Sequence, residues 1–253
     1  MKVTLLGTGT SQGVPVIACD CIVCLSEDFR DKRLRSSIMI EIGETNIVID
    51  SGPDFRQQML NHSVKKIDAI LFTHEHKDHV AGLDDVRAFN NSSNKETQVY
   101  ANQRVKEALH REFHYVFSEN KYPGIPRINI NEIKNEKFYI NDIEIIPIEV
   151  LHHKLPVFGF RINKFVYITD VSFISEKEKE KIFGAEVLVI DSLRKKKHPS
   201  HFNLEQSLNL ITEINPNKSF LTHISHYMGK HADVNNELPE NISLGFDGQI
   251  INL

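Results

Sequence analysis

A dense run of metal-type side chains, T-H-E-H-K-D-H, occupies residues 73–79, directly after the apolar stretch 69–72. Packing does not explain this run, because imidazole and carboxylate groups are poor core residues. His74 and His76 are two residues apart, so an extended segment would point them the same way, whereas Asp78 and His79 must follow a turn at the start of a helix. This arrangement predicts two metal ions held by one loop.

The three cysteines of the chain form a second cluster, C-x-C-x-x-C, at Cys19, Cys21 and Cys24. Three thiols cannot form a closed set of disulfides, so thiolates bound to a metal in a reducing cytoplasm fit the pattern better. A structural zinc site needs four ligands, and the spacing alone does not supply the fourth. The cysteines therefore predict a metal site separate from the histidine run.

Length and composition favour a globular protein with one domain, residues 1–253, and a substantial core. The net charge is −4, so no overall basic field attracts nucleic acid, and no apolar run approaches the ~20 residues needed to span a bilayer. Residues 1–7 are too short an apolar segment for a signal peptide and predict a first strand. The basic run 194–198 could be a solvated loop or could bind an anionic substrate, and composition leaves both open.

Short β-type runs come first and helical patterns follow between later strands, which indicates an α/β fold. Runs ending in Asp50, Asp170 and Asp191 are almost continuously apolar, as in a sheet covered on both faces with polar groups at its strand ends. We expect the polar segment 90–97 to be an exposed loop. The strands are expected at 3–6, 36–42, 46–50, 69–73, 143–150, 157–162, 165–169, 187–190 and 218–222, and the helices at 102–117, 175–183 and 204–214, the last capped by Asn203.

With its strand before and its helix after, the histidine run resembles the signature of the metallo-β-lactamase superfamily. The resemblance implies a four-layer αββα sandwich with a dinuclear metal site at the sheet edges. It also implies a later His, a bridging Asp and a final His at strand ends, which match His152, Asp170 and His223. His153 is the alternative to His152, which fits the motif better. Asp50 matches a family position that orients a ligand histidine.

The resemblance divides these ligands between two divalent ions, zinc or manganese, with His74, His76 and His152 on one, Asp78, His79 and His223 on the other, and Asp170 between them. A water bound between two such ions becomes hydroxide near neutral pH and attacks phosphorus or a carbonyl. We therefore expect a metal-dependent hydrolase, with Asp78 counted among the catalytic residues as well as the ligands.

Further motifs resemble the cyclic phosphodiesterases of the bacterial carbon–phosphorus lyase pathway. These motifs are G-T-G-T-S-Q-G-V-P at 7–15, L-T-H-I-S-H at 221–226 and G-F-D-G at 245–248. The resemblance implies that His226 joins the three cysteines on a structural zinc, that His201 lies beside the substrate, and that the protein is a homodimer. For His201 we expect leaving-group protonation or phosphate binding. Loop amides near residue 7 could line an anionic pocket.

The leading hypothesis is a phosphodiesterase acting on small phosphate esters, cyclic esters included. A nuclease resembling the tRNA 3′-processing endonuclease is an alternative, although no long insertion could serve as a tRNA-binding arm and the chain is mildly acidic. A carboxylic or thioester hydrolase is a second alternative, because the same hydroxide attacks carbonyls. A metal-dependent binding protein is a third, and the intact ligand set argues against it.

Overall fold

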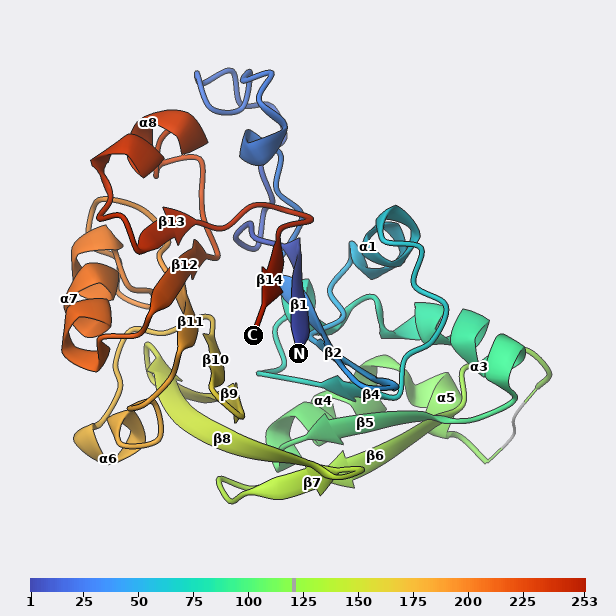
Figure 1. The fold of residues 1–253 in the computed structure, drawn as a ribbon. Helices are drawn as coiled ribbons and strands as arrows, with labels where there is room; N and C mark the ends of the chain where they lie inside the picture. The colour runs from blue at the N-terminus through green and yellow to red at the C-terminus, as the bar shows by residue number, and fades with distance from the viewer. Residues whose placement is uncertain (120–121) are drawn as a thin grey trace.

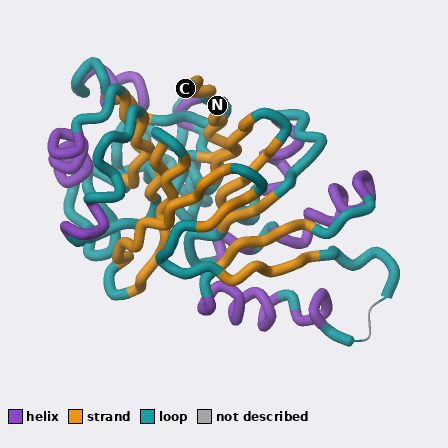
Figure 2. The backbone as a smooth tube through the Cα atoms, turned by 60° about the horizontal axis from the view of Figure 1, so that its bottom comes forward, coloured by secondary structure: helices purple, strands orange, loops and turns teal. Residues whose placement is uncertain are grey.

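The computed structural model describes residues 1–119 and 122–253. Its strands form two seven-stranded sheets that lie face to face, and helices cover the outer face of each (Figure 1). Figure 2 shows the same arrangement from below, with strands in the middle and helices outside. This is the αββα sandwich of the metallo-β-lactamase fold, as the sequence predicts.

The first sheet has the strand order β14-β1-β2-β3-β4-β5-β6. Its strands are β1 (Lys2–Gly7), β2 (Ser37–Ile42), β3 (Thr45–Ile49), β4 (Ala69–Leu71), β5 (Thr97–Ala101), β6 (Ile128–Glu132) and β14 (Ile250–Asn252). The edge strand β14 pairs with β1, so the two ends of the chain meet, and the Met1 amino group donates to the Leu253 carbonyl at 2.9 Å.

The second sheet has the order β13-β12-β11-β10-β9-β8-β7. Its strands are β7 (Phe138–Ile140), β8 (Ile143–His152), β9 (Leu155–Ile162), β10 (Phe165–Ile168), β11 (Val187–Asp191), β12 (Lys218–Thr222) and β13 (Ile242–Leu244). Strands β10 to β13 are parallel, so their carboxyl ends meet at one edge, where the side chains that follow them converge.

Three apolar layers hold the sandwich together. The first lies between the sheets and includes Phe160 and Tyr167. The second joins the first sheet to its helices and includes Phe55 and Phe72, and the third lies between the second sheet and its helices. The helices are α1 (Phe55–Asn61), α2 (Lys77–Val80), α3 (Arg87–Ser93), α4 (Gln103–Glu112), α5 (His114–Phe117), α6 (Glu176–Lys179), α7 (Leu204–Ile214) and α8 (His231–Glu237), with short 3₁₀ turns η1 (Phe29–Asp31) and η2 (Leu83–Val86).

Helix α7 has the predicted bounds, and the Asn203 side chain accepts from the Gln206 amide while the Gln206 side chain accepts in return, a complete capping box. The expected helix 102–117 is instead two helices, because the backbone leaves helical geometry at Phe113. Helix α6 is shorter than the 175–183 pattern predicts.

The prediction of an exposed loop at 90–97 is confirmed only in part, because residues 91–96 are exposed but only 94–96 lie outside a helix or strand. Helix α3 extends to Ser93, β5 begins at Thr97, and Asn90 is buried. Its amide donates to the carbonyls of Lys95 and Arg127 and to the Thr97 hydroxyl. A polar side chain that satisfies neighbouring backbone groups can be buried, so polarity alone did not indicate exposure here.

Among the described residues, no helix is long and apolar enough to cross a membrane.

Candidate metal centre

The histidine run is arranged as its spacing predicts. After β4 the chain bends at Thr73 and Glu75, His76 has an extended backbone (φ −65°, ψ 150°), and helix α2 then begins at Lys77. His74 and His76 therefore lie close together, with His74 Nε2 3.0 Å from His76 Nδ1, while Asp78 and His79 lie on the first turn of α2.

The structure brings the predicted donors into two adjoining groups. In each group one potential ligand atom per residue lies within 4.8 Å of all the others. The first group is His74, His76 and His152, and the second is Asp78, His79, Asp170 and His223.

Asp170 lies between the two groups. Its Oδ2 is 3.2 Å from His79 Nε2 and 3.3 Å from His223 Nδ1, while its Oδ1 is 4.0 Å from His74 Nε2. One carboxylate therefore faces both groups, which is the position that a bridging ligand requires.

The buried donors fit metal ions better than they fit one another. His79 Nε2 is buried 3.1 Å from Asp78 Oδ2 and 3.2 Å from Asp170 Oδ2, but it makes no well-aligned hydrogen bond with either. A cation between these atoms would satisfy all three. Nitrogen and oxygen donors at these separations suit zinc or manganese. The residues present therefore fit a dinuclear centre.

The Asp50 carboxylate holds Thr73 and His79 in place at one edge of the centre. Its Oδ2 is 2.7 Å from His79 Nδ1 and also accepts from the Thr73 hydroxyl, while its Oδ1 accepts from the Thr73 amide at 2.9 Å. With Nδ1 held in this way, the Nε2 of His79 faces Asp78 and Asp170. This is the arrangement expected of a carboxylate that orients a metal-ligating histidine.

Strained backbone marks three of the strand ends. Asp50, Asp170 and His223 adopt φ values of 64°, 54° and 56°, in the left-handed region that non-glycine residues rarely occupy. Such conformations persist where the surroundings hold them, and they concentrate at functional sites. Each one turns the chain so that a side chain enters the centre.

Of the two candidate histidines at the β8–β9 turn, His152 reaches the centre. Its Nδ1 is 2.7 Å from the Ser200 carbonyl, which accepts the hydrogen bond and leaves Nε2 for the first group. His153 is exposed, and its amide donates to the Ser172 hydroxyl. The structure thus gathers His152 with the other donors and not His153.

His201 lies directly beside both groups. Its ring is 4.6 Å from that of His152 and stacks at 4.8 Å on that of His223. Burial would lower the pKa of His201, but the Asp191 carboxylate, 2.9 Å from Nδ1, raises it to about 9. His201 therefore carries a proton near neutral pH, at a place where an acid could act.

Burial shifts the pKa values of the acidic groups and of His223 in opposite directions. Burial lowers the pKa of His223 to about 4, and burial also raises the pKa of Asp50 and of Asp191. For Asp170 burial acts to raise the pKa, yet the neighbouring His223 and His79 hold it well below its ordinary value. The pKa of His79 is instead held well above its ordinary value, because the carboxylates of Asp78, Asp170 and Asp50 outweigh its burial, so metal binding at this imidazole would release a proton.

The second cluster also converges. The Nδ1 of His226 is 3.3 Å from Cys19 Sγ, 3.5 Å from Cys21 Sγ and 3.4 Å from Cys24 Sγ. A tetrahedral zinc ion with usual bond lengths separates its ligand atoms by about 3.6 Å. Three thiols and one imidazole could therefore hold one zinc ion with no open position. We name residues 16–26 together with His226 the zinc knuckle.

The first part of the glycine-rich stretch, residues 7–10, is used for backbone packing, and the expectation that loop amides line an anionic pocket stays a prediction for Ser11 and Gln12. The amides of Thr8, Gly9 and Thr10 donate to Asp247, Leu34 and Ile224, so they are not free to bind an anion. A Cβ at Gly7 would come within 2.0 Å of the Arg35 carbonyl. These glycines permit close backbone packing, and spacing alone did not distinguish that use from anion binding.

Sequence reasoning gave no role to several groups that support the centre. Asp191 orients His201, the Ser200 carbonyl fixes His152, and the hydroxyls of Thr10, Ser36 and Thr169 lie 3.2–3.3 Å from ring nitrogens of His223. The sequence did carry a signal for Asp191, because it ends the third apolar run that terminates in an aspartate. The hydroxyls carried none, because their approach depends on tertiary packing.

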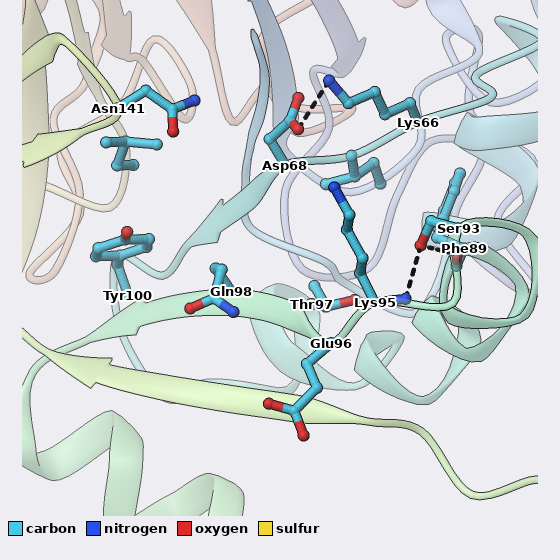
Figure 3. A pocket seen from close by; sticks show the side chains of 12 residues that line it. Lys66, Asp68, Phe89, Ser93, Lys95, Glu96, Thr97, Gln98, Tyr100 and Asn141 are labelled. Atoms are coloured by element: carbon cyan, nitrogen blue, oxygen red, sulfur yellow. Dashed lines mark hydrogen bonds and ion pairs between the residues drawn. The ribbon is translucent and has the colours of Figure 1, made fainter.

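A cavity of about 510 Å³ lies away from the centre (Figure 3). It is lined by residues at the amino ends of β4 and β5, among them Lys66, Asp68 and Lys95, whereas the metal-type side chains follow the carboxyl end of β4. Lys66 and Asp68 form an ion pair across 2.9 Å within it. This cavity is therefore not part of the candidate centre.

The fold and the two donor groups are those expected of the metallo-β-lactamase superfamily. A family model described as the Beta-lactamase superfamily domain matches residues 45–224, and the chain belongs to the metallo-β-lactamase superfamily, whose members bind divalent metals such as zinc. A crystal structure described as a new diphosphatase from the PhnP family is 36% identical, with a TM-score of 0.93, and the match covers 99% of this chain and 96% of that one. Within the superfamily, the chain belongs to the PhnP family.

Two curated relatives match this chain less completely than that crystal structure does. An octanoyltransferase from Porphyromonas gingivalis is 41% identical over 252 residues, which cover 98% of this chain and 51% of that protein. A ribonuclease Z from Staphylococcus epidermidis is 31% identical over 121 residues, covering 46% of this chain and 38% of that protein. The chain thus spans about half the length, or less, of these curated relatives.

Proposed function

We propose that this protein is a phosphodiesterase that hydrolyses small phosphate esters at the dinuclear centre. The observation that carries the proposal is the position of His201, whose Nδ1 is 2.9 Å from Asp191 Oδ2 and whose ring stacks on His223 and lies 4.6 Å from that of His152. The similarity to a protein described as a diphosphatase supports a phosphorus substrate.

Two divalent metals at this centre would supply Lewis acidity toward both water and the phosphoryl oxygens. Five side chains, His74, His76, His152, His79 and His223, would hold them together with Asp78 and the bridging Asp170. We assign His201 the role of general acid, donating its proton to the leaving oxygen from Nε2 while Asp191 holds Nδ1. Asp191 stabilises the imidazolium and prevents the ring from rotating away.

We also propose that the zinc knuckle is structural, with Cys19, Cys21, Cys24 and His226 as ligands. A closed set of four leaves no position for substrate, so its contribution would be to the fold around the centre. The homodimer, the cytoplasmic location and the single-domain organisation expected from the sequence stay predictions.

Hydrolysis of bis(p-nitrophenyl) phosphate tests the function directly. We expect metal-loaded protein to hydrolyse it, His76→Ala to lose the activity, and His201→Ala to retain metal. Because p-nitrophenolate leaves without being protonated, the fall of about 10²–10⁴-fold in kcat for His201→Ala is expected with an alkyl phosphate diester as substrate. His110→Ala, in the exposed part of α4, is the matched control and should behave as wild type. If wild-type protein and His76→Ala are equally inactive with the metals present, the proposal is wrong.

Two alternatives have specific support. The similarity to ribonuclease Z favours a test with tRNA precursor, in which salt-sensitive binding and 3′ cleavage would indicate a nuclease. The similarity to an octanoyltransferase favours a test with an octanoyl thioester, since a metal-activated water also attacks carbonyls. That similarity covers about half of the octanoyltransferase, so we assign no acyl transfer to this chain.

A further inference from the structure

The segment between β11 and α7 bends at Pro199, two residues before the candidate acid His201. Ser200 follows the proline, and in the described part of the chain all of its hydrogen bonds are to histidines. Its carbonyl accepts from His152 Nδ1 at 2.7 Å, while its amide and its hydroxyl lie 3.3 Å and 3.1 Å from His198 Nδ1. Ser200 therefore connects His198 to a donor of the first group.

The direction of the bond between His198 and Ser200 follows from the chemistry of the two partners. A backbone N–H can only donate, so His198 Nδ1 must be the acceptor, and the ring proton lies on Nε2. Burial lowers the pKa of His198, and the positive charges of His201 and Arg194 lower it further, while Asp191 acts in the opposite direction. The His198 ring is therefore neutral near pH 7, which leaves the Nδ1 lone pair available to the Ser200 amide.

The spacing of the two partners is that of a side-chain-closed turn. A side-chain acceptor that bonds the amide two residues ahead closes a local turn, as Asn and Asp do in Asx turns. His198 and Ser200 have this spacing, and Pro199 lies between them. The proline ring fixes φ at about −65° and also restricts the residue before it, so less entropy is lost when the turn forms. The sequence His-Pro-Ser is thus suited to a turn that the histidine closes.

Both histidines that this turn places belong to the candidate centre or its border. The Ser200 carbonyl holds Nδ1 of His152 and so leaves its Nε2 for the first donor group. The next residue, His201, is held by Asp191, and its ring lies 5.2 Å from that of His198. A shift of the turn would therefore move a metal-type donor and the candidate acid together.

We propose that His198 positions His152 and His201 by closing this turn. Its Nδ1 holds the Ser200 amide, and the Ser200 carbonyl in turn orients the His152 ring. The part of the inference that concerns His201 rests on the proposed phosphodiesterase function, whereas the part that concerns His152 applies to metal binding alone. His198 itself is a positioning residue, with no proton transfer and no substrate contact assigned to it.

Metal affinity of His198→Ala and His198→Asn tests the turn. Alanine removes the acceptor, whereas asparagine can accept from the Ser200 amide in the same way but carries no imidazole. For His198→Ala we expect the metal affinity, measured by competition with a chelator, to fall about tenfold, the lower end of the range for losing a group that supports a metal ligand. His198→Asn should recover most of that affinity.

Activity at saturating metal reports on His201. The alkyl diester glycerophosphoethanolamine has a leaving group that must be protonated, whereas bis(p-nitrophenyl) phosphate does not. We expect kcat of His198→Ala to fall about tenfold more with the alkyl diester, as part of what general acid catalysis contributes, and His198→Asn to recover most of it. His110→Ala, which removes an exposed imidazole on α4, is the matched control and should equal wild type in both measurements.

Two results would overturn the inference while leaving the phosphodiesterase intact. The first is an equal metal affinity for wild type and His198→Ala. The second is an equal loss in the alanine and asparagine variants, which would mean that the imidazole itself is required. If wild type hydrolyses neither ester, the proposed function fails, and the chelator competition still decides whether His198 positions His152. Thermal melts show whether each variant is folded, and His198→Gln, whose amide lies one bond further from the backbone, replaces an alanine variant that is not.

Discussion

His223 and His226 are three residues apart on the segment that follows β12, and each belongs to a different cluster of metal-type side chains. Between them, the Ile224 amide donates to the Thr8 carbonyl and the Ile224 carbonyl accepts from Thr10. One short segment therefore joins the candidate dinuclear centre, the glycine-rich loop and the zinc knuckle. A disturbance of the zinc knuckle should be detectable at the centre.

Removing one thiol tests this connection. We expect Cys21→Ser to contain one metal ion fewer per chain than wild type, to melt at a lower temperature and to lose part of its activity through displacement of His223. Elemental analysis, thermal melts and kcat measure the three effects. Glu27→Gln, an exposed side chain next to the zinc knuckle that does not belong to the cluster, is the control. Unchanged metal content in Cys21→Ser would contradict the assignment of the zinc knuckle.

Asp50→Asn should weaken metal binding without removing a ligand. The amide can still contact Thr73, but it cannot provide the charge that orients His79 through Nδ1, and loss of such support typically costs 10–100-fold in affinity or activity. Competition with a chelator measures the metal affinity. Asp68→Asn, a carboxylate on the same sheet at the amino end of β4, should bind metal as wild type does. Equal affinities for both variants would show that Asp50 does not orient the ligand.

Gly52→Ala should lower both stability and activity. A Cβ at Gly52 would lie 2.0 Å from the Asp78 carbonyl, so the loop bearing Asp78 must move. We expect a loss of about 2–4 kcal/mol in the free energy of unfolding, as for other severe backbone clashes. Gly43→Asn is the control, since nothing lies within 4 Å of its Cβ and asparagine tolerates the left-handed φ of 56°. Urea unfolding distinguishes the variants, and similar midpoints would show that the loop adapts.

Much of the centre could be predicted because its signals are local. The run 73–79 places four donors within six residues. The apolar strands that precede Asp170 and His223 mark where further donors leave the sheet. Short or half-buried strands gave weaker signals. Strand β5 alternates buried and partly exposed residues over only five positions, and β13 and β14 have three residues each, too few to show a period. The supporting hydroxyls around His223 come from segments distant in sequence, so no local pattern revealed them.

Glu178 should make stability depend on pH through a group remote from the metals. Burial would raise the pKa of Glu178, but hydrogen bonds from Lys181, Asn135 and the Glu149 amide lower it below its ordinary value. A lowered pKa in the folded state contributes stability above the unfolded-state pKa, about 4.3, and this contribution disappears as the pH falls through the folded-state value.

We therefore expect Glu178→Gln to be less stable than wild type at pH 7 by about 1–3 kcal/mol, and the difference to shrink as the pH falls below about 4. Urea unfolding at several pH values measures it. Glu176→Gln, an exposed neighbour on the same helix, should show a small difference at every pH. A difference for Glu178→Gln that stays constant from pH 7 to pH 3 would mean that its carboxylate charge does not contribute.

The pairing of β1 with β14 places both chain ends at the edge of the first sheet, and β1 runs from that point toward the glycine-rich loop. A second protein joined in frame at either end would thus emerge at the end of β1 opposite to the glycine-rich loop that approaches His223. This geometry is suited to gene fusion at either end, and the octanoyltransferase relative is about twice the length of this chain. It also makes the termini a convenient attachment point for a tag or a surface linker in the assays above.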